Sequence, residues 1–149
     1  MLPLAKKATP AAIAVLRQAT ALFPKRKKAS DGLLPSKAHV KKNPNSDHNT
    51  GYAVDITHDP ANGINCVDLF IKLQEDKRVK YLIFQGRIWS QKTGVTPYTG
   101  SNEHNKHLHI SIKDGHGNDI SEWFPWLGKA KTVGKIVSKV KPLPKKDTK

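Results

Sequence analysis

The sequence predicts an α+β fold in which a small antiparallel sheet has helices packed beside it. Two short segments, residues 51–57 and 106–112, alternate apolar and polar side chains in the manner of half-buried strands. Residues 10–23 instead have the apolar spacing of an amphipathic helix. A chain of 149 residues is about the length of one domain and can bury a core without disulfides.

Turn signals separate the elements along the chain. The first helix is followed at residues 24–45 by a stretch rich in Pro, Lys and Ser, which we expect to be a long loop. The strand at 51–57 then leads through the turn DPANG into a helix over about residues 64–74. The remaining expected elements are a strand at 79–90 broken or bulged at Gly86, a loop at 93–105, the strand at 106–112 and an apolar closing segment at 120–128.

Charge divides the chain into three parts. The net charge is +14, and the excess of positive charge lies at the two ends. Residues 1–42 hold ten Lys or Arg against one Asp, whereas residues 43–128 hold eight against ten acidic residues. Residues 129–149 hold eight lysines and one Asp. Basic ends around a near-neutral middle predict an anionic polymer or surface as the partner.

The change in composition predicts a domain at residues 1–128 and a basic tail at residues 129–149. Lysines in the tail alternate with apolar residues at helical spacing: Val133, Ile136, Val137 and Val140. Such a segment is either an amphipathic helix that binds an anionic envelope surface, a terminal helix packed on the domain, or flexible chain.

Three features bear on where the protein is made. The single cysteine, Cys66, excludes an internal disulfide and fits folding in a reducing cytosol. No run approaches the ~20 apolar residues of a membrane span. Arg17 interrupts the first apolar stretch, so we expect this stretch to belong to the fold and not to be a secretory signal. A partner protein would then have to release the chain from the cytoplasm.

Histidines and one aspartate form the candidate chemical site. His48 lies in a polar turn, and Asp55 lies on the polar face of the strand that follows it. In the strand at 106–112, His107 and His109 share the face opposite the apolar residues, and His104 precedes them. Zinc is bound by imidazole nitrogen and carboxylate oxygen, and a catalytic zinc has three protein ligands. Each segment alone is typical of a polar turn or a solvated strand edge, but together they predict a metal site.

The same residues carry a resemblance to a known family. SDHNTGYAVD (residues 46–55) resembles the SxHxxGxAxD motif of the M15 group of zinc peptidases, which cut peptide bonds in bacterial cell walls. HLHIS resembles the last metal-binding strand of that group, and HNKHLH is similar to the penicillin-insensitive murein endopeptidase. KASDGLLPS, DITHDPANG and PYTGSNEHNKHLHISI resemble M15-type phage endolysins. The resemblance covers roughly residues 10–113 and implies a hedgehog/DD-peptidase-like fold.

The resemblance implies three zinc ligands: His48, Asp55 and His109. It also implies that His107 is the catalytic base or stabilises the oxyanion, with His104 as its supporting or proton-transfer partner. Many M15 members carry an acidic base three residues before the last zinc histidine, and this chain has Lys106 there. The base is therefore assigned to one of the two other histidines, with Glu103 as a further alternative.

Two more residues are candidates for substrate binding. Ser46 either hydrogen-bonds the substrate, orients a metal ligand or caps a turn. Arg87 follows an apolar strand and either pairs with a carboxylate of the substrate or is an ordinary surface arginine.

The expected function is that of a phage endolysin, a zinc endopeptidase that cuts the peptidoglycan stem peptide at the L-alanyl–D-glutamate bond. Bound zinc would lower the pKa of water towards ~7 and polarise the scissile carbonyl. Expected partners are peptidoglycan and, through the basic tail, an anionic envelope surface, with the protein acting as a monomer after holin-type release. The alternatives are a bacterial D,D-carboxypeptidase or murein endopeptidase, and a basic nucleic-acid-binding protein. A near-neutral middle without a groove-reading helix counts against nucleic acid as partner.

Overall fold

The computed structural model describes residues 5–100 and 102–127, so the basic tail predicted at 129–149 lies outside the described residues. The helices in this part of the chain are α1 (Pro10–Leu22), α2 (Lys37–Lys42) and α3 (Cys66–Lys72), with short 3₁₀ helices η1 (Asp47–Thr50), η2 (Pro60–Asn62) and η3 (Leu73–Glu75). The strands are β1 (Ala53–Thr57), β2 (Val79–Phe84), β3 (Arg87–Ser90), β4 (Gly94–Pro97) and β5 (His107–Ile112). Among the helices described, none is both long and apolar enough to cross a membrane.

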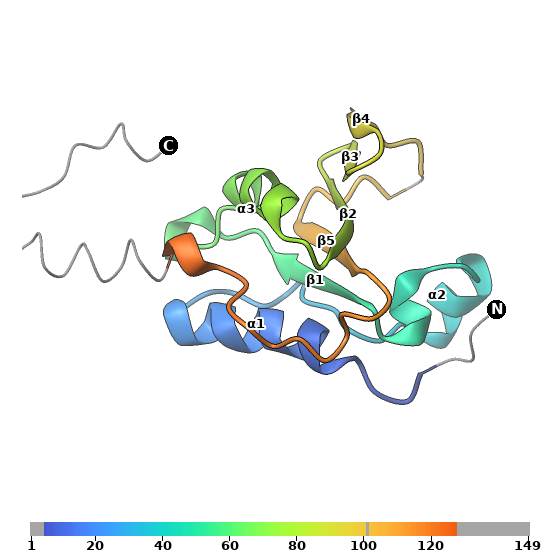
Figure 1. The fold of residues 1–149 in the computed structure, drawn as a ribbon, viewed down its shortest axis with the longest axis horizontal. Coiled ribbons are helices and arrows are strands. Elements are labelled where there is room, and N and C mark those ends of the chain that lie inside the picture. The colour runs from blue at the N-terminus through green and yellow to red at the C-terminus, as the bar shows by residue number, and fades with distance from the viewer. Residues whose placement is uncertain (1–4, 101, 128–149) are drawn as a thin grey trace, which may run out of the picture.

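The strands form one antiparallel sheet in the order β1-β5-β2-β3-β4 (Figure 1). The last strand in the sequence, β5, therefore lies between β1 and β2 and pairs with both. In the view of Figure 1, α1 runs below β1 and α3 lies above it, near β2. This arrangement confirms the predicted α+β class with a small antiparallel sheet and adjacent helices.

One face of the sheet is apolar and packs against the helices. Val54 and Ile56 of β1 lie opposite Ile110 and Leu108 of β5, and all four are fully buried. Side chains of α1 and α3 complete this core: Ala11, Ala12, Val15, Ala19, Cys66, Leu69 and Phe70. Because side chains alternate along a strand, the polar residues of β1 and β5 are left on the opposite face. The alternation predicted for both strands is therefore confirmed.

The first helix is fixed at its start by local capping. The Thr9 side chain accepts a hydrogen bond from the Ala12 backbone N–H at 3.3 Å, and Pro10 occupies the first helical position. At a helix start several backbone N–H groups lack a partner. The Thr9 side chain satisfies one of them, and Pro10 has no N–H to satisfy. The same Thr9 hydroxyl donates to the Gly51 carbonyl at 3.0 Å, which ties α1 to the turn before β1.

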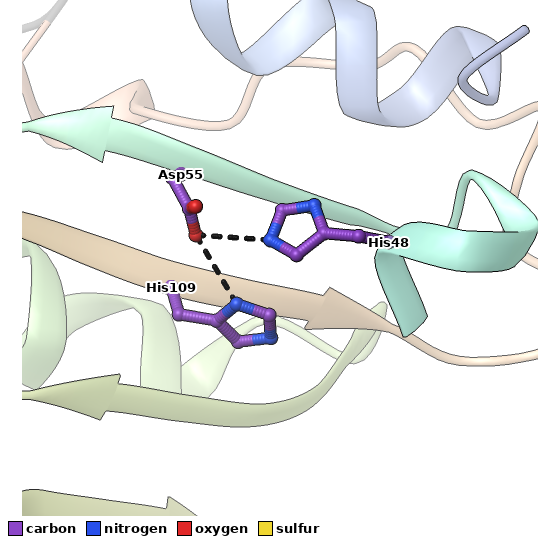
Figure 2. A group of neighbouring side chains, drawn as sticks. All are labelled: His48, Asp55 and His109. Atoms are coloured by element: carbon purple, nitrogen blue, oxygen red, sulfur yellow. Dashed lines mark hydrogen bonds and ion pairs between the residues drawn. The ribbon is translucent and has the colours of Figure 1, made fainter. Parts of the chain in front are cut away.

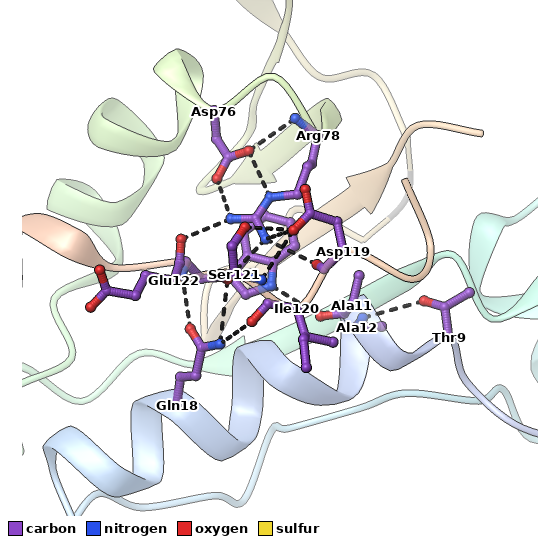
Figure 3. A network of polar contacts seen from close by, with 11 residues as sticks. Thr9, Ala11, Ala12, Gln18, Asp76, Arg78, Asp119, Ile120, Ser121 and Glu122 are labelled. Carbon is purple, nitrogen blue, oxygen red and sulfur yellow. Dashed lines mark hydrogen bonds and ion pairs between the residues drawn. The ribbon is translucent and has the colours of Figure 1, made fainter. Parts of the chain in front are cut away.

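Arg78 holds the closing segment against the body of the domain (Figure 3). It is 3% exposed, and its guanidinium donates to both carboxylate oxygens of Asp76 and to the carbonyls of residues 119, 121 and 122. The guanidinium carbon also lies 3.7 Å from the centre of the Trp123 ring. Gln18 of α1 adds an acceptor for the Trp123 backbone N–H. The predicted closing segment is thus fastened by a buried cation as well as by apolar contact.

The structure differs from the sequence-based expectation in two loops and one strand. The expected loop at 24–45 contains α2, and the expected loop at 93–105 contains β4. The expected strand at 79–90 is two strands, β2 and β3, joined at Gln85 and Gly86 in an antiparallel hairpin. Both turn residues have positive φ, 49° and 76°, as a two-residue hairpin turn requires. The break at Gly86 is therefore a reversal of the chain.

Candidate metal centre

Two of the predicted ligands are held by the sheet itself. Asp55 on β1 and His109 on β5 are directly paired across the ladder, so their side chains project side by side from the polar face. His109 is 4% exposed, and its Nδ1 lies 3.1 Å from Asp55 Oδ1. The pairing brings together two residues that are 54 positions apart in the sequence.

The third predicted ligand, His48, comes from η1, which precedes β1. The Ser46 hydroxyl accepts a hydrogen bond from the His48 backbone N–H and so caps this short helix. Gly51 ends it with φ +81°, and a side chain there would lie 2.8 Å from the Lys7 carbonyl. Glycine is needed at this position because both the backbone conformation and the space exclude a Cβ. The tight reversal returns the chain towards His48 as β1 begins.

The three side chains converge on one point (Figure 2). His48 Nε2 lies 3.2 Å from Asp55 Oδ1, the same oxygen that contacts His109. One ligand atom from each of the three residues lies within 4.8 Å of the others, so the group could hold a metal ion. Two imidazole nitrogens and a carboxylate oxygen are a donor set that zinc accepts.

The hydrogen bonds of His48 show that the group fits a cation. His48 Nδ1 lies 2.7 Å from the Leu33 carbonyl, which can only accept, so Nδ1 carries the proton. In the neutral ring Nε2 is then an unprotonated acceptor that faces a carboxylate oxygen. Two acceptors at this distance repel unless a proton or a metal ion lies between them. The second nitrogen of His109 is also held, at 2.7 Å from the Ser111 hydroxyl.

The close contact between His48 and Asp55 also shifts the pKa values of both residues. Burial lowers the pKa of His48, but the hydrogen bond and charge of Asp55 outweigh burial and leave the pKa raised. For Asp55, burial raises the pKa, and hydrogen bonds from His109 and His48 reverse the shift and hold it well below its usual range. The carboxylate therefore stays charged, as a ligand for a cation must be.

His107 and His104 stand beside this group. His107 Nε2 lies 3.6 Å from the other carboxylate oxygen of Asp55, and its ring centre is 5.0 Å from that of His104. His104 has φ +59°, which is uncommon for a residue with a side chain, and its Nδ1 is buried without a hydrogen-bond partner among the described residues. Backbone strain and an unpartnered polar atom at one residue are typical of a functional position.

Both of these histidines are neutral at pH 7. Burial, followed by the charges of His109 and His107, lowers the pKa of His104 to about 4. Burial also lowers the pKa of His107, although the Asp55 charge opposes the shift. A neutral imidazole keeps one nitrogen free to accept a proton, and a base is most effective when its pKa is near the working pH. His104, with a pKa of about 4, is therefore poorly matched to the role of proton acceptor at neutral pH.

A cleft of about 510 Å³ opens over the group. The five residues of the predicted metal and catalytic set all line it. The rest of its wall is mainly polar or aromatic: His39, Asn43, Pro44, Asn45, Ser46, Tyr81, Ile83, Tyr98, Gly100 and Asn102. A concave surface with converging polar groups is the usual form of a small binding or catalytic site.

The other predicted residues have different surroundings. Ser46 lines the cleft, and its hydroxyl lies 3.2 Å from His39 Nε2 in addition to capping η1. Arg87 is exposed on β3 and is not among the residues that line the cleft. Lys106 is exposed and its carbonyl accepts from the His58 backbone, while Glu103 is exposed and accepts from Asn105. Neither Lys106 nor Glu103 is among the residues that line the cleft.

Sequence reasoning missed two residues of the site. His39, on α2, lines the cleft with its ring centre 5.8 Å from that of His48. Tyr81 on β2 stacks on His109, with ring centres 5.4 Å apart and planes 17° from parallel. A signal for His39 was present, because Ser36 caps the helix and Asn43-Pro44 follows its end. Tyr81 could be found only from the pairing of β2 with β5.

The fold and this group define an α+β protein with a candidate metal centre on the polar face of its sheet. Among known protein families, the model of the family described as "VldE, C-terminal domain" matches residues 5–109, and the chain belongs to this family. The matched range includes the three candidate ligands and ends at His109. No curated protein and no solved structure matches the chain.

Proposed function

We propose that this protein is a zinc-dependent peptidase that hydrolyses an amide bond in the peptidoglycan stem peptide. The observation that carries the proposal is the group formed by His48, Asp55 and His109 at the base of a polar cleft. The arrangement of two histidines and one carboxylate, with two further histidines beside them, agrees with the M15 motifs in the sequence. A hedgehog/DD-peptidase-like fold is part of the same proposal.

In this proposal His48 Nε2, Asp55 Oδ1 and His109 Nδ1 hold zinc. Bound zinc would supply Lewis-acid polarisation of the carbonyl and activation of water at neutral pH. His107 accepts the proton from water and passes it to the leaving amine, with an effect of typically 10²–10⁴-fold for such a group. His104, whose ring centre lies 5.0 Å from that of His107, is its supporting or proton-transfer partner, and Tyr98 packs edge-on against His104 with ring centres 5.6 Å apart.

The biological role that we propose is host-cell lysis by a phage endolysin, with L-alanyl–D-glutamate as the bond that is cut. The basic tail at residues 129–149 would hold the protein on an anionic envelope surface. Removal of the tail should then slow lysis of intact cells more than digestion of purified peptidoglycan. An equal loss on both substrates would contradict a role in surface binding.

A test of the proposed function needs the metal content and the reaction products of the same samples. Wild-type protein should contain about one zinc per chain and release new amino termini from purified peptidoglycan, identified by mass spectrometry. His48→Ala should lose both properties. The matched control is His116→Ala, because His116 lies in the turn after β5 and outside the cleft. A zinc-free wild-type protein, or full lysis by His48→Ala, would refute the proposal.

A further inference from the structure

A second groove meets the main cleft at the candidate metal centre. It has a volume of about 220 Å³ and is lined by residues 32–36 together with His39, His48 and Asp55. The same three residues also line the main cleft. The two hollows therefore lie next to one another, with His48 and Asp55 of the candidate metal centre between them.

The wall of this groove is a fixed part of the fold. The Gly32 N–H donates to the Asp55 carbonyl at 3.0 Å, and the Asp55 N–H donates to the Gly32 carbonyl at 2.8 Å. Next along the chain, the Leu33 carbonyl accepts from His48 Nδ1. Ser36 then caps α2. Backbone pairing and a capped helix thus hold residues 32–36 beside β1, so the groove is preformed.

Glycine keeps the groove open at its junction with the cleft. A Cβ at Gly32 would lie 3.3 Å from Asp55 Oδ2, closer than most side chains approach. Any larger residue would fill the space next to the carboxylate and press on it. The absence of a side chain at this position therefore lets the wall of the groove approach β1 closely without a steric contact on the Asp55 carboxylate.

The groove differs in chemistry from the main cleft. Its own lining residues are Gly32, Leu33, Leu34, Pro35 and Ser36, none of which is charged. Leu34 is 39% exposed, so its side chain is available to a ligand. The main cleft instead presents histidine, asparagine and tyrosine side chains. The groove suits a small aliphatic residue of a peptide, and the cleft suits a polar one.

We propose that residues 32–36 form a second substrate subsite, which binds an uncharged aliphatic residue on one side of the cleaved amide. This inference rests on the proposed function and specifies its substrate as a peptide that continues on both sides of the metal position. The carbon–nitrogen bond then breaks within the chain, water supplies the new carboxylate oxygen, and the amine takes the proton. An enzyme that removes only a terminal residue does not need a second subsite for a longer peptide.

The test uses stem peptides lengthened by one residue at a time at either end, with the full chain. Binding is measured calorimetrically on zinc-free protein, and cleavage is measured on zinc-loaded protein. For wild-type protein, extension at one end should raise affinity by about tenfold, or ~1.4 kcal/mol. Leu34→Trp, which fills the groove, should abolish this gain. Val95→Trp, at an exposed apolar residue outside both hollows, should keep it.

Leu34→Glu provides a second variant, which places a carboxylate on the uncharged wall formed by residues 32–36 and should also abolish the gain. An unchanged gain in the folded Leu34 variants would overturn the inference, as would a wild-type protein that gains nothing from extension. Release of terminal residues alone would overturn it and leave the peptidase function standing. Extension-dependent binding that is lost in Leu34→Trp, without any cleavage, would support the subsite and refute the hydrolytic function.

Discussion

Ser111 should control how tightly the candidate centre binds zinc, although it is not itself a ligand. Its hydroxyl lies 2.7 Å from His109 Nε2, and the two residues are 0% and 4% exposed. This bond fixes the imidazole so that Nδ1 points at Asp55. Groups that orient metal-binding histidines typically contribute 10- to 100-fold to metal affinity.

The size of the effect of Ser111→Ala follows from the burial of this pair. Leaving a buried nitrogen without its partner costs ~1–3 kcal/mol. Because this cost is present with and without zinc, it should appear as a lower melting temperature of the zinc-free protein. Zinc affinity should fall through the lost orientation of His109, by about 10- to 100-fold. The assay is competition for zinc with a chromophoric chelator at neutral pH, together with thermal unfolding of the zinc-free protein.

The matched control for Ser111→Ala is Ser90→Ala. The Ser90 hydroxyl contacts Thr93 in an exposed hairpin connection on β3 and β4, away from the cleft. This variant should bind zinc as the wild type does. If folded Ser111→Ala keeps zinc affinity within twofold of wild type, the orienting role of the serine is wrong.

Three further predictions concern stability and reactivity. Trp123 is fully buried and donates to the Ala11 carbonyl at 3.0 Å, so Trp123→Ala should lower the free energy of unfolding by about 3–5 kcal/mol in a urea titration; a loss below 1 kcal/mol would contradict its place in the core. The folded-state pKa of Asp55 lies below its unfolded value in zinc-free protein, so its stabilising contribution is complete above about pH 4 and is lost as the pH falls further. The difference in melting temperature between wild type and Asp55→Asn should therefore shrink from pH 6 to pH 3, and a constant difference would refute this linkage. Burial raises the pKa of the Cys66 thiol to about 12, so a thiol reagent at pH 8 should react with it only after denaturation, and rapid reaction of the native protein would show that the α3 start opens.

The candidate site was predictable from sequence wherever local alternation sets the direction of a side chain. The spacing in β5 places His107 and His109 on the face opposite Leu108 and Ile110, and the structure has this arrangement. Asp55 follows in the same way from the alternation in β1. Period-two patterns are informative because one face of each strand is buried.

The remaining features depend on contacts that no local pattern contains. α2 has six residues and no buried side chain, so it lacks the apolar periodicity by which a helix is recognised. β4 is similarly half exposed and forms only through pairing with β3. The place of Tyr81 above His109 follows from the insertion of β5 between β1 and β2, which is a property of the whole sheet.

The central position of β5 also sets the order in which the site can mature during synthesis. His48 and Asp55 leave the ribosome early, but their partner His109 lies on the last strand of the sheet. Until β5 has been made, β1 and β2 have no strand between them and present open edges. The nascent chain thus carries two of the three candidate ligands without the complete candidate site. Closure of the sheet and completion of the candidate metal centre become a single late event, so a chain interrupted before residue 107 would lack the centre and present open strand edges.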